Sequence, residues 1–206
     1  MPLPLDDLEP WHGSLTPEAD LDRLLLDGSD LTGADGEGAR VLECLLRGCD
    51  LDQTVLDHAH LLDSTLAECR AGTLRARSST WRDVTVDGCR FGALGVFGSG
   101  WDRVTIRGGK IDYLNLRDAK VHDLRLVDCT IGDLDLAGCA VRKLRTEGCQ
   151  VRRLDVSRAQ LKDADLRGME LRGIDGTAGL RGATISSEQL YDLAGALADH
   201  LGVRVD

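Results

Sequence analysis

The chain has 206 residues, 42% of them hydrophobic, and a net charge of −10, which suits one domain with a buried core. Aromatic residues make up only 3%, so we expect a narrow core filled by smaller side chains. No run of 18 apolar residues occurs, which excludes a membrane-spanning helix, and the start of the chain lacks the basic and apolar regions of a signal peptide. A cytoplasmic protein without membrane contact is therefore expected.

The negative charge is concentrated in the first third of the chain. Residues 1–70 hold 16 acidic and 4 basic residues, whereas residues 71–140 hold 9 and 10, and residues 141–206 hold 10 and 11. Because phosphate backbones are bound by Lys and Arg, an acidic chain disfavours direct binding to nucleic acid. It is compatible with a basic protein partner.

Residues 1–18 precede the regular part of the sequence and are expected to form an N-terminal cap. Trp11 is large enough to pack over the end of the core, and Thr16-Pro17-Glu18 is typical of a helix start.

From residue 19 to residue 175 the sequence repeats every five residues. Taking every fifth position from Leu21 to Leu171 gives 31 positions, and all but Gly36 and Thr146 are apolar. A helix has a period of 3.6 and a strand a period of 2, so a period of five fits neither element.

A second set of buried positions lies two residues before the first. All seven cysteines occur there: Cys44, Cys49, Cys69, Cys89, Cys129, Cys139 and Cys149. Each five-residue unit therefore places two side chains inside, a larger apolar one and a smaller one, and three outside. Two inward residues followed by a corner describe one side of a polygonal coil.

A second period of 20 residues indicates four sides in each coil. One column holds Cys49, Cys69, Cys89, Gly109, Cys129, Cys149 and Met169, and another holds Leu74, Leu94, Leu114, Leu134 and Leu154. Small columns alternate with large ones, which fills a narrow core without voids. The sequence predicts an all-β solenoid, a four-sided parallel β-helix of about eight coils and about 37 Å in length.

Residues 176–206 are expected to form a C-terminal helix and tail. Ser186 and Gln189 have the spacing of a capping box, and Gly202 suits the end of the helix. The expected apolar face of the helix covers the last coil and is also a candidate dimer interface: Leu190, Leu193, Ala194, Leu197 and Leu201.

The residue types that carry chemistry have structural explanations. The cysteines point inward and should act as small hydrophobic groups, not as metal ligands or disulfides. His58 and His60 lie at outward positions next to Asp57 and Asp63, without a third His or a Cys nearby. Asp is abundant, and we expect it to serve turns and corners. The sequence contains no supported catalytic pair or triad, so we expect no enzyme activity, no cofactor and no metal site.

Two further features lie between residues 81 and 109. Gly92, Gly95, Gly98 and Gly100 loosely resemble a phosphate-binding loop, but no helix follows to hold a phosphate. We expect instead that Gly92, Gly100, Gly108 and Gly109 relieve crowding around Trp81 and Trp101. Phe97 lies at an outward position and is a candidate for partner contact.

The repeat resembles the pentapeptide-repeat family, whose motif is Ala-(Asp/Asn)-Leu-x-x. Clear copies are Ala19-Asp20-Leu21 and Ala164-Asp165-Leu166, with a looser copy at Ser29-Asp30-Leu31. The resemblance covers residues 19–175 and implies a right-handed quadrilateral β-helix. Family members often dimerise through the C-terminal region, which implies a homodimer here.

The resemblance also implies two alternatives for function. Qnr-type and MfpA-type members imitate duplex DNA and bind type II topoisomerases, which protects these enzymes from fluoroquinolones; the partner implied here is DNA gyrase or another type II topoisomerase. Here the acidic surface would be Asp27, Asp30, Asp35, Asp50, Asp52, Asp57, Asp63 and Glu68, which lie near one end only. Duplex DNA carries evenly spread charge, so an interaction protein with a different partner is the other interpretation.

Overall fold

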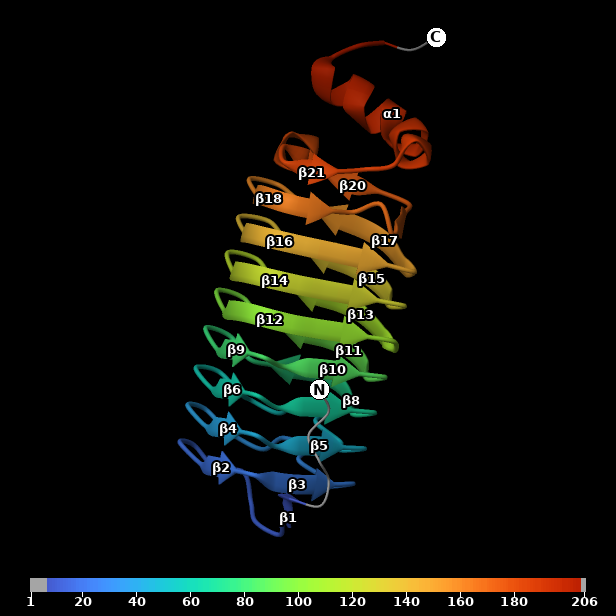
Figure 1. Ribbon diagram of the computed structural model, residues 1–206. Coiled ribbons are helices and arrows are strands. Elements are labelled where there is room, and N and C mark those ends of the chain that lie inside the picture. Colours follow the sequence, from blue (N-terminus) through green and yellow to red (C-terminus); the bar gives the residue numbers. More distant parts are fainter. Residues whose placement is uncertain (1–6, 205–206) are drawn as a thin grey trace.

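The computed structural model describes residues 7–204 and shows a parallel β-solenoid whose coils are stacked along one axis (Figure 1). Strands pair with strands one coil away, and the register is 20 residues, as for Trp81 with Trp101 and Trp101 with Val121. Within the described part of the chain, residues 19–178 form eight such coils. The predicted solenoid and its two periods are confirmed.

The first two sides of the coils form one sheet of 14 strands within residues 7–204. On the first side lie β2 (Asp20–Asp22), β4 (Arg40–Leu42), β6 (His60–Leu62) and β9 (Thr80–Arg82). On the second side lie β1 (Glu9–Pro10), β3 (Leu24–Asp27), β5 (Leu45–Arg47), β7 (Thr65–Ala67), β10 (Thr85–Asp87) and β21 (Ala183–Thr184). Single strands cover parts of both sides in the later coils: β12 (Gly100–Arg107), β14 (Lys120–Val127), β16 (Ala140–Glu147) and β18 (Gln160–Asp165).

The other sheet covers the third side and continues onto the fourth, which otherwise consists mainly of turns. Its strands are β8 (Arg70–Arg75), β11 (Arg90–Gly95), β13 (Lys110–Asn115), β15 (Thr130–Asp135), β17 (Cys149–Asp155), β19 (Met169–Leu171) and, on the fourth side, β20 (Ile174–Asp175). In the first coils of the fourth side, isolated bridges join Asp35 to Val55 and Val55 to Arg75.

The corners explain part of the abundance of Asp and Gly. Most corners place the residue two after the central apolar one in the left-handed region, as at Asp63 (φ 49°), Asp83 (φ 55°) and Asp163 (φ 53°). Gly adopts this region without strain, and Asp tolerates it better than branched residues do. The corner between the third and fourth sides is extended from β8 onward, so it lacks this requirement.

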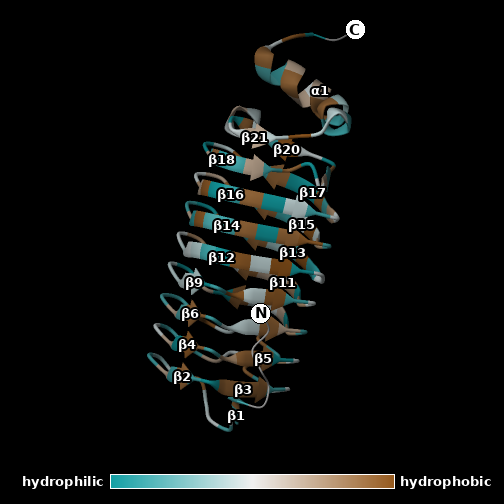
Figure 2. Ribbon diagram, in the orientation of Figure 1, coloured by the Kyte–Doolittle hydropathy of each residue, from teal (hydrophilic) through white to brown (hydrophobic). Residues whose placement is uncertain are grey.

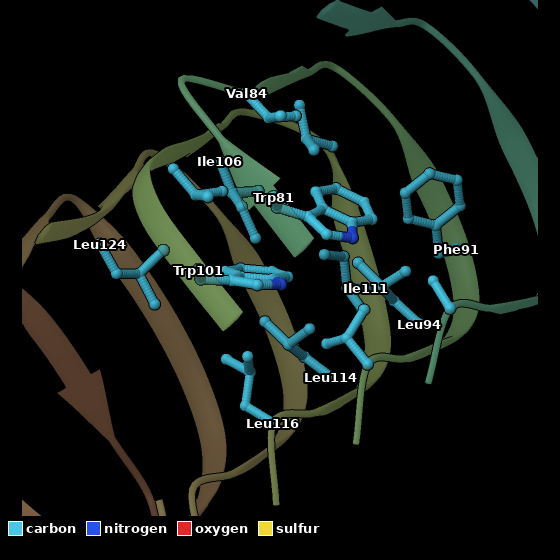
Figure 3. Packing of buried hydrophobic residues seen from close by; sticks show 14 of the residues in the cluster. Trp81, Val84, Phe91, Leu94, Trp101, Ile106, Ile111, Leu114, Leu116 and Leu124 are labelled. Atoms are coloured by element: carbon cyan, nitrogen blue, oxygen red, sulfur yellow. The ribbon is translucent and has the colours of Figure 1, made fainter. Parts of the chain in front are cut away.

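The core is a continuous column of inward side chains, part of which is drawn in Figure 3. Figure 2 shows hydrophobic and hydrophilic residues alternating along the strands that enclose it. Trp81 and Trp101 stack with ring centroids 5.2 Å apart, and Trp81 Nε1 donates to Ser79 Oγ at 2.8 Å. All seven cysteines are buried and free. The expectation that the glycines relieve crowding is right for Gly92 and Gly109, but the crowding does not come from the tryptophans. A Cβ at either position would collide with the backbone of the preceding coil. A Cβ at Gly100 would meet no atom within 4 Å.

The described N-terminal residues continue the solenoid by half a turn. β1 pairs with β3, with Glu9 opposite Leu24, and Leu15 is buried beneath the first coil. A Cβ at Gly36 would lie 2.9 Å from the Leu15 side chain, which explains why the repeat is interrupted there. The predicted helix start at residues 16–18 is wrong, because these residues form a turn with Glu18 at φ 57°. Residues 1–6 of the expected cap lie outside the described part of the chain.

The C-terminal end is closed by a 3-10 helix, η2 (Thr177–Leu180), and by α1 (Ser187–Leu201). The predicted capping box is confirmed, because Gln189 N donates to Ser186 Oγ at 3.1 Å and Ser186 N donates to Gln189 Oε1 at 2.8 Å. Gly202 ends the helix at φ 70°. The remaining interruption of the repeat, Thr146, donates from its hydroxyl to the carbonyl of Asp165 at 3.1 Å.

No helix within residues 7–204 is long and apolar enough to cross a membrane.

Candidate interaction surface

The eight acidic residues of the predicted partner surface do not lie on one side of the rod. Asp27 and Glu68 belong to the second side, Asp63 to the corner after β6 on the first, and Asp35 and Asp57 to the fourth. Asp30 and Asp50 are neighbours on the third side through a parallel bridge, and Asp52 follows in the same coil as Asp50. The acidic residues therefore encircle the first three coils.

Three of these carboxylates, Asp27, Asp50 and Asp57, are neutralised by arginines one coil away. Arg47 donates to both carboxylate oxygens of Asp27, at 2.9 and 2.6 Å, and Arg70 Nε donates to Asp50 at 3.0 Å. The hydrogen bond from Arg47 lowers the pKa of Asp27. These pairs follow from the 20-residue register, which stacks outward residues of successive coils.

Other acidic residues in the set cap backbone N–H groups. Asp30 accepts from Thr32 N at 3.0 Å and Asp35 from Glu37 N at 3.0 Å, which are Asx turns. Asp52 accepts from Thr73 N, one coil further on, at 2.9 Å. The expectation that Asp serves turns and corners is confirmed for these positions.

Asp57 is the member of the set that is buried. It is 9% exposed, accepts from Arg77 N at 2.8 Å and forms ion pairs with Arg75 at 2.9 Å and Arg77 at 3.3 Å. Asp63 and Glu68 are exposed, and neither forms an ion pair with another residue of the described range. These two carboxylates are the members best placed to meet a partner.

The apolar face of α1 divides into a covered and an exposed part. Leu193 is 4% exposed and Leu197 packs on the end of the core, whereas Leu190 and Leu201 are 50% and 75% exposed. The expectation that all four leucines cover the last coil is therefore wrong for Leu190 and Leu201. Because the helix packs on the solenoid through Gln189 and Leu193, the neighbouring positions Leu190 and Leu201 face solvent.

The sequence prediction missed two residues of this exposed stripe. Tyr191 is 82% exposed and Val203 is 51% exposed. Tyr191 directly follows Leu190, so a helical projection could have placed it beside the leucine stripe.

The remaining chemical candidates lie where the sequence placed them. His58 and His60 are exposed, and no group of three metal-ligating side chains occurs among the described residues. Burial raises the pKa of the Cys139 thiol to about 12, which keeps it protonated and unreactive. Phe97 is 40% exposed on the outside of its coil.

The structure also reveals an open hollow of about 470 Å³ on the third side, lined by residues of β13, β15, β17 and β19. It lies over Gly132, between Asp112 and Arg152 on the neighbouring coils. A Cβ at Gly132 would lie 2.2 Å from the carbonyl oxygen of Asp112. The outward glycine column of Gly72, Gly92 and Gly132 was a signal in the sequence that this side is indented.

The family model for pentapeptide repeats matches residues 18–53 with eight copies. No curated protein sequence matches the chain. Among solved structures, two forms of trypsin-treated QnrB1, a plasmid-mediated fluoroquinolone resistance protein, share 15% and 14% identity with TM-scores of 0.30 and 0.39. They cover 96% of this chain, and 96% and 95% of QnrB1 respectively.

A third similar structure is HetL, a pentapeptide repeat protein involved in heterocyst differentiation regulation from the cyanobacterium Nostoc. The identity is 19%, the match covers 80% of this chain and 93% of HetL, and the TM-score is 0.30. At these identities and TM-scores, none of the three structures supports an argument about partner or activity.

Proposed function

We propose that this protein, a solenoid built of pentapeptide repeats, is a non-enzymatic interaction protein that binds a protein partner on its outer sides. The observation that carries the proposal is the separation of inside from outside. Within residues 7–204 the interior is filled with apolar side chains, and Asp57 and Asp135 are the only charged residues that are buried. The polar groups are thus presented on sides that the strand register holds in place.

The experiment starts with the purified chain as bait and continues with reconstitution. Each captured protein is purified, and its binding is measured by calorimetry. A saturable complex that survives purification supports the proposal. The proposal fails if no captured protein forms a saturable complex once both components are pure.

DNA gyrase is the second candidate partner, through imitation of duplex DNA. The observation in its favour is the acidic surplus of the first 70 residues, together with the exposure of Asp63 and Glu68. Arg47 and Arg70 neutralise Asp27 and Asp50, which makes the electrostatic potential around the first coils less negative. We therefore expect any imitation of DNA to depend on the carboxylates outside such pairs.

A supercoiling assay with purified gyrase tests this candidate. Micromolar protein should inhibit supercoiling or protect gyrase from a fluoroquinolone, and Asp63→Asn with Glu68→Gln should weaken the effect. The matched control is Asp163→Asn with Glu170→Gln, since Asp163 occupies the same type of left-handed corner five coils away. Absence of both effects, or equal loss in both double variants, contradicts the imitation of DNA.

We also propose that the C-terminal region forms a homodimer contact through four exposed apolar residues: Leu190, Tyr191 and Leu201 of α1, and Val203 just beyond its end. Isolated apolar residues are common on surfaces, whereas four within one short segment favour a contact surface. Light scattering coupled to gel filtration should give a dimer mass, and Leu190→Glu with Tyr191→Glu should give a monomer with an unchanged far-ultraviolet spectrum. A monomer for the unmodified chain at 100 μM would contradict the contact.

A further inference from the structure

Several outward charges of this solenoid pair with an opposite charge on the next coil. The register places Asp27 next to Arg47, and their side chains pair at 2.6 Å. Asp83 and Arg103 pair in the same way at 2.6 Å, one coil apart. Neighbouring coils lie about 4.8 Å apart, so opposite charges at stacked positions stabilise the fold and like charges destabilise it.

Like charges are stacked on β14, β16 and β18, as they also are at Arg70, Arg90 and Lys110 on the third side. Arg125 is in register with Arg145, and Arg142 is in register with Lys162. All four are exposed, and Lys120 is exposed on β14 as well. We call Lys120, Arg125, Arg142, Arg145 and Lys162 the basic face.

Two acidic groups near the basic face have other partners, whereas Asp163, which follows Lys162, is exposed and forms no ion pair within the described residues. Asp123 pairs with Lys143, and Asp165 binds Arg167 through both carboxylate oxygens, at 2.9 and 2.7 Å. Among the residues that the structure describes, Arg142, Arg145 and Lys162 form no ion pair. Arg125 lies 4.0 Å from Asp123 and Arg145 is in register with Asp165, so the same strands neutralise the basic face only in part.

We propose that the basic face binds an acidic segment of a protein partner, which would supply the negative charges that the coil stacking lacks. The inference rests on the proposed interaction function and names a surface for it. The five cations belong to strands β14 and β16, which are continuous across two sides, and to β18 beside them (Figure 1). A short run of carboxylates on a strand or helix can match such a grid of charges.

An acidic protein segment fits this face better than nucleic acid does. The same two sides carry the exposed carboxylates of Asp63 and Glu68 in the third coil, which would repel the phosphates of a duplex lying along the rod. The basic face also lacks aromatic side chains on which unpaired bases could stack. A short acidic segment near the basic face would be shielded from Asp63 and Glu68, because charges further apart than about 8 Å are largely screened at physiological salt.

The test measures binding of a fluorescein-labelled poly-glutamate decapeptide by fluorescence anisotropy. Arg142→Glu with Arg145→Glu should raise its Kd by about tenfold or more, and higher salt should weaken binding of the unmodified protein. The control is Arg152→Glu with Arg153→Glu, which makes the same charge change in the same coil but on the third side. This control should change the Kd by less than about threefold.

A stability measurement separates a binding role from a structural one. Arg142→Glu places a carboxylate between His122 and Lys162 and removes the like-charge contact, so Tm should rise by about 1–4 °C while peptide binding falls. A fall in Tm would mean that Arg142 serves the fold, and it would overturn the proposal. Tighter binding of a 20-base-pair duplex than of the peptide would also overturn it.

The outcome also distinguishes this inference from the proposed function. If a reconstituted protein partner binds the two double variants equally well, the basic face is not its site, and the interaction function stands without this inference. If no partner forms a complex while the peptide still requires Arg142 and Arg145, the basic face is retained and the proposed function fails.

Discussion

The side-chain amide of Gln189 donates to the carbonyl oxygen of Leu166 at 2.7 Å. The two residues are 23 positions apart in the sequence, as are Cys69 and Leu46, whose thiol and carbonyl group form a hydrogen bond inside the solenoid. A residue of α1 thus takes the place that a buried side chain of another coil would occupy. The same amide donates to the carbonyl of Met169 at 2.5 Å, so the helix closes the solenoid by hydrogen bonds as well as by apolar contact.

Replacing Gln189 should uncouple α1 from the last coil. Gln189→Ala removes the donor that the carbonyl groups of Leu166 and Met169 share, so the free energy of unfolding should fall by about 1–3 kcal/mol. Chemical denaturation followed by circular dichroism measures it. Glu188→Ala, at an exposed neighbouring position, is the control, and equal losses for the two variants would show that Gln189 is not a structural cap.

Leu15 and Gly36 should behave as a coupled pair. Gly36→Val restores the repeat but collides with Leu15, which should cost about 1–3 kcal/mol, and Leu15→Ala should cost about 2–5 kcal/mol through the cavity. The double variant should be more stable than the sum predicts, with a coupling of about 0.5–3 kcal/mol. Additive effects would mean that Leu15 does not fill the space above Gly36.

Adjacent residues of β15 should differ sharply in their effect on stability. Leu134 is 1% exposed, so Leu134→Ala should lower the free energy of unfolding by about 2–5 kcal/mol. Asp133 is on the outside, where it pairs with Arg152 at 2.6 Å, so Asp133→Ala should cost less than about 1 kcal/mol. Urea denaturation compares the two variants, and similar costs would contradict the assigned inward and outward positions.

Acid should weaken the C-terminal coils through Asp165. The hydrogen bond from Arg167 lowers the pKa of Asp165 from 3.8 to about 2. Because the folded state holds the lower value, this contribution is complete above about pH 4 and is lost as the pH falls through 2. Thermal unfolding between pH 7 and pH 2 should therefore show a smaller loss of Tm for Asp165→Asn than for the unmodified chain.

Asp163→Asn is the control for this titration, because it removes the same charge at an exposed corner two residues away. It should keep the acid dependence of the unmodified chain. If Asp165→Asn and Asp163→Asn have the same pH profile, the pair of Asp165 and Arg167 does not contribute to acid stability.

The sequence by itself was sufficient for the solenoid, its two periods and the capping box. The reason is local: each coil contacts only its neighbours, so the inward positions keep the same five-residue spacing along the chain and can be read from the sequence. The same regularity placed the seven cysteines inside and assigned many aspartates to turns and corners. Gly36 and Thr146 were visible only as exceptions.

Only the tertiary structure decided what those exceptions and the charges do. Leu15 reaches Gly36 from outside the repeat, and the orientation of α1 buries Leu193 while exposing Leu190, which the helical pattern treats alike. Ion pairs depend on which side chains meet 20 residues apart in the sequence. The number of acidic residues alone therefore predicted a negative surface that included Asp27 and Asp50, although arginines on the next coil neutralise both. Periodicity determines which way a side chain points, but contacts between coils determine whether its charge remains available.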